Sequence, residues 1–289
     1  MQPQKTGPFP YTPITRRPRL RWPDNARLAL WVAPNVEVFP LDRVVPFGTG
    51  SNPDVLGWSQ RDYGNRVAFF RLADVLKKHG LRGTVALNSD MCDAHPAVVE
   101  YAMERGWEFM SHGQTNSQYV TGLDAIAEAA YIKGSFDRIE SFTGKRPRGW
   151  LAPGVQMTWN TLDSVIAAGG QYVCDFVNDD QPYLMDLGGQ RLVSIPYSSE
   201  INDLPQFLRN MRTADEFETM IKRQFDVLYR EGAESGRVMC ISLHPFIIGV
   251  PHRIQALDNA LAYICSHAGV WKTTGSEIVD HYLQSGATF

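Results

Sequence analysis

Short apolar runs alternate with amphipathic segments along most of this chain, and this alternation limits the possible folds more than any other feature. Strand-like runs cover residues 27–33, 83–88, 107–111, 149–152, 172–176, 237–243 and 270–273. Helical apolar spacing covers residues 62–79, 123–142, 160–168, 214–231, 253–267 and 276–284. Seven or so strand-to-helix units in succession predict an α/β fold, a distorted (β/α) barrel of about seven parallel strands.

An open, doubly wound sheet has the same periodicity, so the pattern alone does not exclude it. The chain contains neither a G-x-G-x-x-G nor a G-x-x-x-x-G-K-[ST] motif, which removes the main reason to favour a nucleotide-binding open sheet. Residues 183–187 and 191–196 bracket Gly188 and Gly189 and are typical of a hairpin.

The first 24 residues are rich in proline and show little periodicity, which predicts an extended arm lying on the body or on a neighbouring subunit. Residues 25–289 are then expected to form a single barrel domain. The chain has a formal net charge of −3, which argues against a nucleic-acid partner. It also has no apolar run of the roughly 18 residues needed to span a membrane. Four widely spaced cysteines and no apolar leader segment make a reduced, cytoplasmic location the expectation.

Polar side chains follow four of the predicted strands. They are Asn35 and Glu37, then His112 and Asn116, then Pro153 and Gly154, and finally His244. Active sites of (β/α) barrels lie at the carboxyl ends of the strands, so these residues are expected to meet at one mouth. Two histidines, a glutamate and asparagines suit hydrolysis. The other five histidines lie at helix ends or in surface-type contexts and are interpreted as structural.

Two further features each allow two interpretations. Trp150 and Trp159 either form walls of the substrate pocket or belong to the core. Residues 47–58 form either a loop that covers the site or a plain connection. Pro153 and Gly154 are expected to let the backbone approach the substrate.

In their order along the chain, these strand ends resemble the polysaccharide deacetylase superfamily. There the first strand ends in two acids, a later strand carries H-[ST]-x-x-H, an R-x-P-[FY]-G-like segment follows, and a late strand ends in Leu-His. The corresponding pieces here are residues 35–37 (NVE), 112–116 (HGQTN), 150–154 (WLAPG) and 243–244 (LH). The resemblance implies the deacetylase-like (NodB-homology) barrel.

Two positions depart from the family pattern. Asn35 stands where the family has its general base, and an amide cannot accept a proton at neutral pH. Asn116 stands where the family has its second metal-binding histidine. If a divalent metal such as zinc binds, Glu37, His112 and Asn116 would be its ligands, a poor set for zinc.

The departures, together with likenesses spread over residues 20–285, make the chain similar to the allantoinase and cyclic-imide hydrolase branch of this superfamily. These likenesses include residues 21–23 (RWP), 62–64 (DYG), 144–150 (GKRPRGW) and 225–229 (FDVLY). The resemblance implies no obligatory metal and a homo-oligomer, a tetramer. The expected activity is hydrolysis of a non-peptide C–N bond that opens a small cyclic amide or imide.

The expected roles follow from the chemistry of amide hydrolysis. Glu37 would be the general base or orient the water, His112 would position the water or polarise the carbonyl, and His244 would protonate the leaving nitrogen. Asn35 and Asn116 would donate hydrogen bonds to substrate or oxyanion, and Trp150, Pro153 and Gly154 would contact substrate. Two alternatives stay open: a metal-dependent N-deacetylase of an acetylated sugar or polysaccharide, and a non-enzymatic barrel that binds a ligand.

Overall fold

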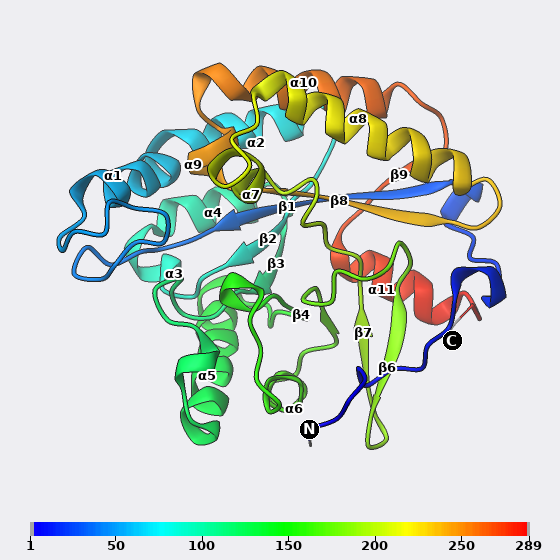
Figure 1. Ribbon diagram of the computed structural model, residues 1–289, viewed down its shortest axis with the longest axis horizontal. Helices are drawn as coiled ribbons and strands as arrows, with labels where there is room; N and C mark the ends of the chain where they lie inside the picture. The colour runs from blue at the N-terminus through cyan, green and yellow to red at the C-terminus, as the bar shows by residue number, and fades with distance from the viewer. Residues whose placement is uncertain (1–2, 288–289) are drawn as a thin grey trace.

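A curled, mostly parallel sheet forms the centre of the computed structural model, which describes residues 3–287 (Figure 1). Its strands are β1 (Leu28–Val36), β2 (Thr84–Leu87), β3 (Glu108–Ser111), β4 (Gly149–Trp150), β5 (Tyr172–Val173), β6 (Tyr183–Leu187), β7 (Gln190–Ser194), β8 (Arg237–Leu243) and β9 (Val270–Lys272). The order is β6-β7-β5-β4-β3-β2-β1-β8, with β9 beside the first half of β1. The β6–β7 hairpin is antiparallel and the other ladders are parallel.

This arrangement confirms the α/β, deacetylase-like fold class, in the form of a half-barrel. Nine strands are present among residues 3–287 rather than about seven, because the predicted hairpin adds β6 and β7 to the edge of the sheet. The last strand, β9, lies on the same side of β1 as β2. Among residues 3–287, no ladder joins β6 to β8 to complete a closed barrel. All nine residues of β1 are buried, as expected of a parallel strand covered on both faces.

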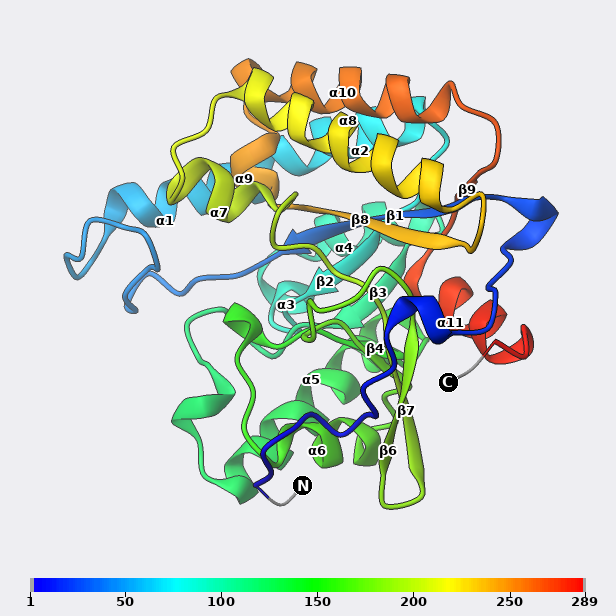
Figure 2. The ribbon, with the colours of Figure 1, turned by 45° about the vertical axis from the view of Figure 1, so that its right-hand side comes forward.

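Helices cover the outside of the sheet, and α2, α8 and α10 lie together over one side (Figures 1 and 2). The helices are α1 (Val55–Tyr63), α2 (Phe69–Lys78), α3 (Met91–Ala94), α4 (Pro96–Glu104), α5 (Ala125–Thr143), α6 (Thr161–Ala167), α7 (Asp203–Leu208), α8 (Ala214–Glu231), α9 (Pro245–Ile248), α10 (Pro251–Cys265) and α11 (Gly275–Gln284). Short 3-10 turns occur at Ile14–Arg16, Pro23–Asn25, Val120–Gly122 and Pro153–Val155. Within the described range, no helix combines the length and the apolar character needed to cross a membrane.

Local chemistry sets several helix ends. The Asp124 carboxylate accepts hydrogen bonds from the first backbone amides of α5, and Gly144 ends that helix with a φ of 72°. Thr213 and Glu216 form a capping box at the start of α8. Such caps are readable in the sequence, and α5 and α8 match the predicted ranges closely.

The helix expected over residues 62–79 begins earlier than predicted. Asp54 caps α1 by accepting a hydrogen bond from Gly57 N at 2.9 Å, so residues 55–58 are helical rather than part of a loop. A π-helical turn, η3 (Gly64–Ala68), joins α1 to α2. The Asn65 amide on this turn donates to the Glu37 carbonyl oxygen at 3.1 Å. The wider turn thus ties the helix to the end of β1, consistent with the frequent location of π-bulges at functional sites.

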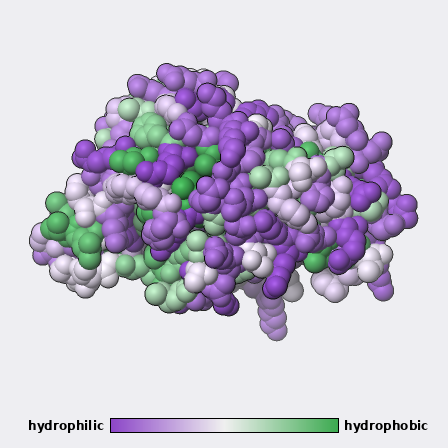
Figure 3. Space-filling view, turned by 90° about the horizontal axis from the view of Figure 1, so that it is seen from above, coloured by the Kyte–Doolittle hydropathy of each residue, from purple (hydrophilic) through white to green (hydrophobic). Residues whose placement is uncertain are grey.

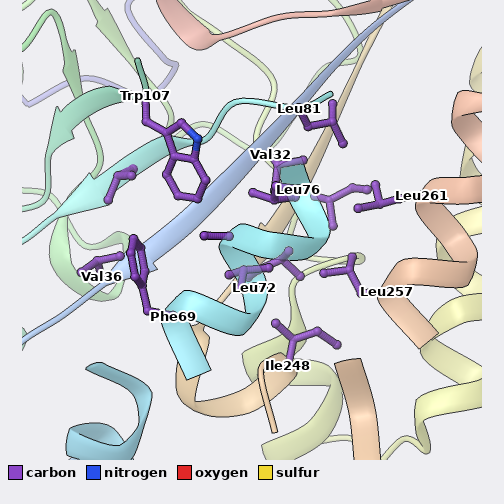
Figure 4. Close-up of a cluster of buried hydrophobic side chains, with 14 of the residues drawn as sticks. Val32, Val36, Phe69, Leu72, Leu76, Leu81, Trp107, Ile248, Leu257 and Leu261 are labelled. Carbon is purple, nitrogen blue, oxygen red and sulfur yellow. The ribbon is translucent and has the colours of Figure 1, made fainter. Parts of the chain in front are cut away.

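The main core lies between the sheet and the α2–α10 layer. Figure 4 shows Phe69, Leu72 and Leu76 of α2 between Val32 of β1 and Leu257 of α10, and each of these side chains is fully buried. Burial of each such side chain contributes about 1.5–3 kcal/mol. This packing holds the carboxyl end of β1 in place.

The N-terminal arm lies along the body of the same chain. Phe9 packs against Phe176 and Tyr183, with ring centroids 5.4 and 4.8 Å away. Arg17 binds the Asp179 carboxylate through two hydrogen bonds of 2.6 and 2.5 Å.

The outer face seen in Figure 3 is largely hydrophilic, and hydrophobic side chains gather toward the end where α1 and the preceding loop lie. Exposed hydrophobic residues of this region are Leu41, Val44, Phe47, Val55 and Leu56.

Candidate active site

A cavity of about 390 Å³ opens at the carboxyl ends of β1, β3 and β8. Six of the residues predicted from strand ends line it: Asn35, Glu37, His112, Asn116, Gly154 and His244. The structure therefore brings together side chains that are up to about 200 positions apart in the sequence, as expected of parallel strands that end at the same edge.

Glu37 lies at the centre of the site and is 6% exposed. Its Oε1 is 3.4 Å from Nε2 of His112 and 3.6 Å from Nε2 of His244, and it accepts a 2.5 Å hydrogen bond from Asn116 Nδ2. Burial raises the pKa of Glu37, but the positive field of His244 and the interaction with His112 outweigh burial and lower that pKa below its ordinary value. Glu37 is thus an ionised carboxylate at neutral pH.

His112 has a fixed orientation. Its Nδ1 lies 2.7 Å from the Leu151 carbonyl oxygen, so Nδ1 carries a hydrogen and donates it. The backbone amide of His112 also donates to Leu87 on β2 at 2.9 Å. Nε2 is left facing Oε1 of Glu37, 3.4 Å away.

His244 is held by Asp203, a residue that the strand-end reasoning missed. His244 Nδ1 is 2.7 Å from Asp203 Oδ1, and the backbone amide of His244 donates to both oxygens of that carboxylate, at 3.0 and 2.8 Å. Burial lowers the pKa of His244, but the carboxylates of Asp203 and Glu37 raise it by more, so it lies above its ordinary value. His244 can therefore hold a proton on Nε2 at neutral pH.

Asn35 and Asn116 use their amide hydrogens within the protein. Asn35 Nδ2 lies 3.1 Å from both the Ala33 carbonyl oxygen and Ser242 Oγ, and 3.3 Å from the Tyr197 hydroxyl. Asn116 donates to Glu37. The sequence predicts that these amides donate to substrate; in the structure, Nδ2 of each already donates to at least one protein acceptor. Within the described part of the chain, Asn116 Oδ1 and Glu37 Oε2 are buried without a hydrogen-bond partner.

Of the residues in the 149–154 region that are expected to contact substrate, Gly154 lines the cavity, whereas Trp150 and Pro153 do not. Trp150 is fully buried in a core cluster, with its ring stacked on Phe136 at 6.3 Å. The prediction that Trp150 contacts substrate is therefore wrong, because its side chain points to the layer under α5. Pro153 is buried and does not line the cavity, whereas Gly154, with a φ of 65°, does. Trp159 is 44% exposed, so it is neither core nor pocket wall.

Residues 47–58, expected either to cover the site or to be a plain connection, reach the cavity through Phe47 alone among its lining residues in the described range. Phe47 lines the cavity, while the capping residue Asp54 holds the turn behind it by accepting a hydrogen bond from Thr49 N at 2.8 Å.

Asp175 follows β5 and is a third buried carboxyl group close to the site, after Glu37 and Asp203. Its Oδ1 accepts a hydrogen bond from Ala152 N at 2.8 Å, and its Oδ2 has no partner within residues 3–287. Burial raises the pKa of Asp175 to about 7, against the opposing effects of the Ala152 hydrogen bond and of His112. Asp175 is thus partly protonated at neutral pH.

The metal ligand set implied by the superfamily does not fit these residues. A catalytic zinc ion takes three nitrogen, sulfur or carboxylate ligands and one open position. Asn116 donates one Nδ2 hydrogen to Glu37 Oε1, which places a hydrogen-bond donor where a cation would need an acceptor. Across residues 3–287, no three His, Cys, Asp or Glu side chains are grouped so as to hold a metal ion.

A buried carboxylate between two oriented imidazoles, at the carboxyl ends of parallel strands, defines a hydrolase site of the deacetylase type. The polysaccharide deacetylase family model matches residues 60–173. A Schizosaccharomyces pombe protein assigned by name to the polysaccharide deacetylases is 30% identical over 234 residues, which cover 75% of this chain and 73% of that protein. This chain therefore belongs to the polysaccharide deacetylase family.

Two solved structures show the same fold over nearly the whole chain. The crystal structure of the PuuE allantoinase has a TM-score of 0.85 and 27% identity, covering 93% of this chain and 94% of that one. A Pseudomonas aeruginosa PAO1 protein assigned to the polysaccharide deacetylases has a TM-score of 0.83 and 27% identity, covering 92% and 94% of the two chains.

Proposed function

We propose that this hydrolase opens a small cyclic amide or imide, of the imide, hydantoin or allantoin type, without an obligatory metal. The observation that carries the proposal is the Glu37 environment: the positions that would complete a metal site instead hold the Asn116 amide, hydrogen-bonded to the carboxylate. The similarity to an allantoinase supports the same reading.

A cyclic imide or hydantoin is reactive enough for this site to hydrolyse it without a metal ion. The leaving nitrogen of a simple acetamide is a poor leaving group, which is why a deacetylase benefits from a Lewis acid. The nitrogen of a cyclic imide or hydantoin leaves as a delocalised anion, and its carbonyl carbon is more electrophilic. Base, acid and oriented water then supply what the reaction needs.

The two unpartnered acceptors suggest where the water binds. Glu37 Oε2 and Asn116 Oδ1 are both buried, and both side chains line the cavity. A water molecule that donates one hydrogen to each would direct a lone pair at a substrate carbonyl. Glu37 takes a proton from this water while the water oxygen forms a bond to the carbonyl carbon of the substrate.

His244 completes the reaction by donating the Nε2 proton to the ring nitrogen as the C–N bond breaks. One water is consumed, and the products are a carboxylate and an amide or ureide on one open chain. Asp203 holds the His244 ring in position and stabilises its protonated form. His112 lies beside the other oxygen of Glu37, with Nε2 3.4 Å from Oε1 and with its ring held by the Nδ1 contact to Leu151, and it fixes the orientation of the carboxylate.

The alternative, a metal-dependent N-deacetylase, is favoured by the assignment of sequence relatives to the polysaccharide deacetylases. It requires Asn116 to turn its oxygen toward a cation shared with Glu37 and His112.

The test is an assay on allantoin, succinimide, maleimide, hydantoin and an N-acetylglucosamine oligomer, each with and without a strong chelator. The proposal expects ring opening that survives chelation. His252 is an exposed histidine at the start of α10, and His252→Gln serves as a matched control for His244→Gln in the same assay. Acetate release that stops on chelation, with no ring opening, would overturn the proposal and establish the deacetylase alternative.

A further inference from the structure

Arg61, on α1, is a buried cation that the hydrolytic scheme leaves without a role. Its side chain is 4% exposed and lines the cavity together with Glu37 and His244. The guanidinium carbon lies 4.7 Å from the centre of the Phe246 ring and 5.4 Å from that of Phe39. These contacts fix the plane of the guanidinium and leave its N–H edges as the polar surface.

Most of those N–H groups have no partner. Nη1 donates to the Gly57 carbonyl oxygen at 3.1 Å and Nη2 donates to that of Pro46. A guanidinium has five N–H donors, so two are used. Nε is buried and unpartnered within the described range, and no carboxylate there lies within 4 Å of this guanidinium as an ion-pair partner. A buried group with unused donors is costly unless something binds them.

The charges of the residues that line the cavity also favour an anionic ligand. Among its lining residues within the described range, Glu37 is the one carboxylate, and it is already flanked by His112 and His244. Arg61 and Arg209 face it with two permanent positive charges. Burial lowers the pKa of Arg61, and the more distant carboxylates Glu37 and Asp54 oppose that effect. A ligand anion would supply the missing counter-charge.

We propose that the substrate is a cyclic amide or ureide that carries a carboxylate substituent, which the N–H edge of Arg61 binds. This inference rests on the proposed ring-opening function and adds the substrate class. A planar fork of N–H donors matches a carboxylate through two parallel hydrogen bonds. A volume of about 390 Å³ is near the small end of ligand pockets and suits one ring with one short substituent.

The experiment uses ring pairs that differ by one carboxylate. Orotate and uracil are measured as equilibrium ligands by calorimetry, and dihydroorotate and dihydrouracil as substrates. We expect the protein to bind orotate about 10- to 100-fold more tightly than uracil, the range of a charged hydrogen-bonded contact. We expect the same direction in kcat/KM for the reduced pair.

Arg61→Gln should reduce both ratios to near one, and Arg61→Lys, which keeps the charge but loses the fork, should give an intermediate value. Arg209→Gln removes the same charge from the other arginine that lines the cavity, an exposed residue whose guanidinium lies 5.1 Å from the Phe47 ring centre, and so tests which of the two cations binds the carboxylate. Arg209→Gln should change the ratios by less than about threefold, through long-range attraction alone.

Equal binding of orotate and uracil by the unsubstituted protein would overturn the inference, whatever the variants do. Equal losses in Arg61→Gln and Arg209→Gln would overturn the assignment to Arg61. A preference for orotate without ring opening of any substrate would support the carboxylate site while overturning the proposed function. Ring opening of dihydrouracil with no preference for dihydroorotate would support the proposed function while overturning the carboxylate site.

Discussion

Nδ1 of His244 lies 2.7 Å from Oδ1 of Asp203, and the same carboxylate also accepts the backbone N–H of His244. Three contacts from one buried carboxylate fix both the ring and the backbone at the carboxyl end of β8. The opposite ring nitrogen is thereby directed at Glu37, 3.6 Å away. The proton donor of the proposed reaction, His244, thus lies between two carboxylates: Asp203, which holds it, and Glu37, the proton acceptor.

Asp203→Asn should make His244 a weaker base. The folded-state pKa of His244 lies above its ordinary 6.5. Burial lowers this pKa, but the negative charge of Asp203, together with that of Glu37, raises it by more. With that charge removed, the pKa falls, and His244 loses its proton at lower pH. The basic limb of kcat/KM against pH should move to lower pH, and activity at pH 8 should fall by roughly 10- to 100-fold, or one to two units of pKa. A uniform decrease with an unmoved basic limb would contradict this role.

Glu37→Gln should remove most of the turnover. The pKa of Glu37 lies below its ordinary 4.5, so the acidic limb of the activity profile should fall below that pH in the unsubstituted protein. Loss of a general base typically lowers the rate by about 10²–10⁴-fold. Asp62→Asn, near the C-terminal end of α1, is a control that removes the same charge from a residue that does not line the cavity. Near-normal turnover by Glu37→Gln would rule out the base assignment.

The sequence revealed those parts of the site that follow regular strands. Glu37, His112 and His244 each come directly after an apolar run, and parallel strands bring such ends to one edge. Asp203 could not be found this way, because it lies on a short helix 41 positions before His244 and meets it through tertiary packing. Arg61 was hidden because it lies just before the helix predicted over residues 62–79, and nothing in its local sequence shows that its side chain turns toward the cavity.

The misplacement of Trp150 has a related cause. In a strand, successive side chains point to opposite faces, and a two-residue strand gives too little pattern to say which face is which. Trp150 points away from the cavity onto Phe136, and the backbone that follows turns Gly154 toward it.

Trp150→Phe should accordingly act on stability rather than on binding. The ring is fully buried against Phe136, and the smaller side chain leaves part of its space unfilled. We expect a loss of about 1–3 kcal/mol in the free energy of unfolding, measured by denaturant titration, with KM changed by less than about twofold. A rise in KM at unchanged stability would return Trp150 to the substrate pocket.

Asp175→Asn should stabilise the protein above neutral pH. The folded-state pKa of Asp175 is about 7, above its ordinary 3.8. Its contribution to stability is therefore fully present below pH 3.8 and is lost as the pH rises through about 7. The asparagine does not titrate, and its oxygen can still accept the Ala152 N–H. The variant should gain up to about 4 kcal/mol over the unsubstituted protein at pH 8.5 and little at pH 4, by thermal unfolding at both pH values. A gain that is the same at both would show that the carboxyl group does not titrate in this range.

Asn116→His tests why the metal site is incompatible with this chain. The substitution removes the Nδ2–H bond to Glu37 and supplies an imidazole nitrogen beside Glu37 and His112, the three-ligand set that zinc accepts. We expect the variant to bind about one zinc per chain at micromolar concentration, measured by calorimetry, and the unsubstituted protein to bind none there. Because a cation would then occupy the position proposed for the water, ring opening should fall on zinc addition and recover with a chelator.

The double variant His112→Gln with Asn116→His, which lacks one ligand, should lose the zinc affinity. Zinc binding of equal strength in the unsubstituted protein would mean that Asn116 already turns its oxygen to a metal, and the deacetylase alternative would then be the better account of this site.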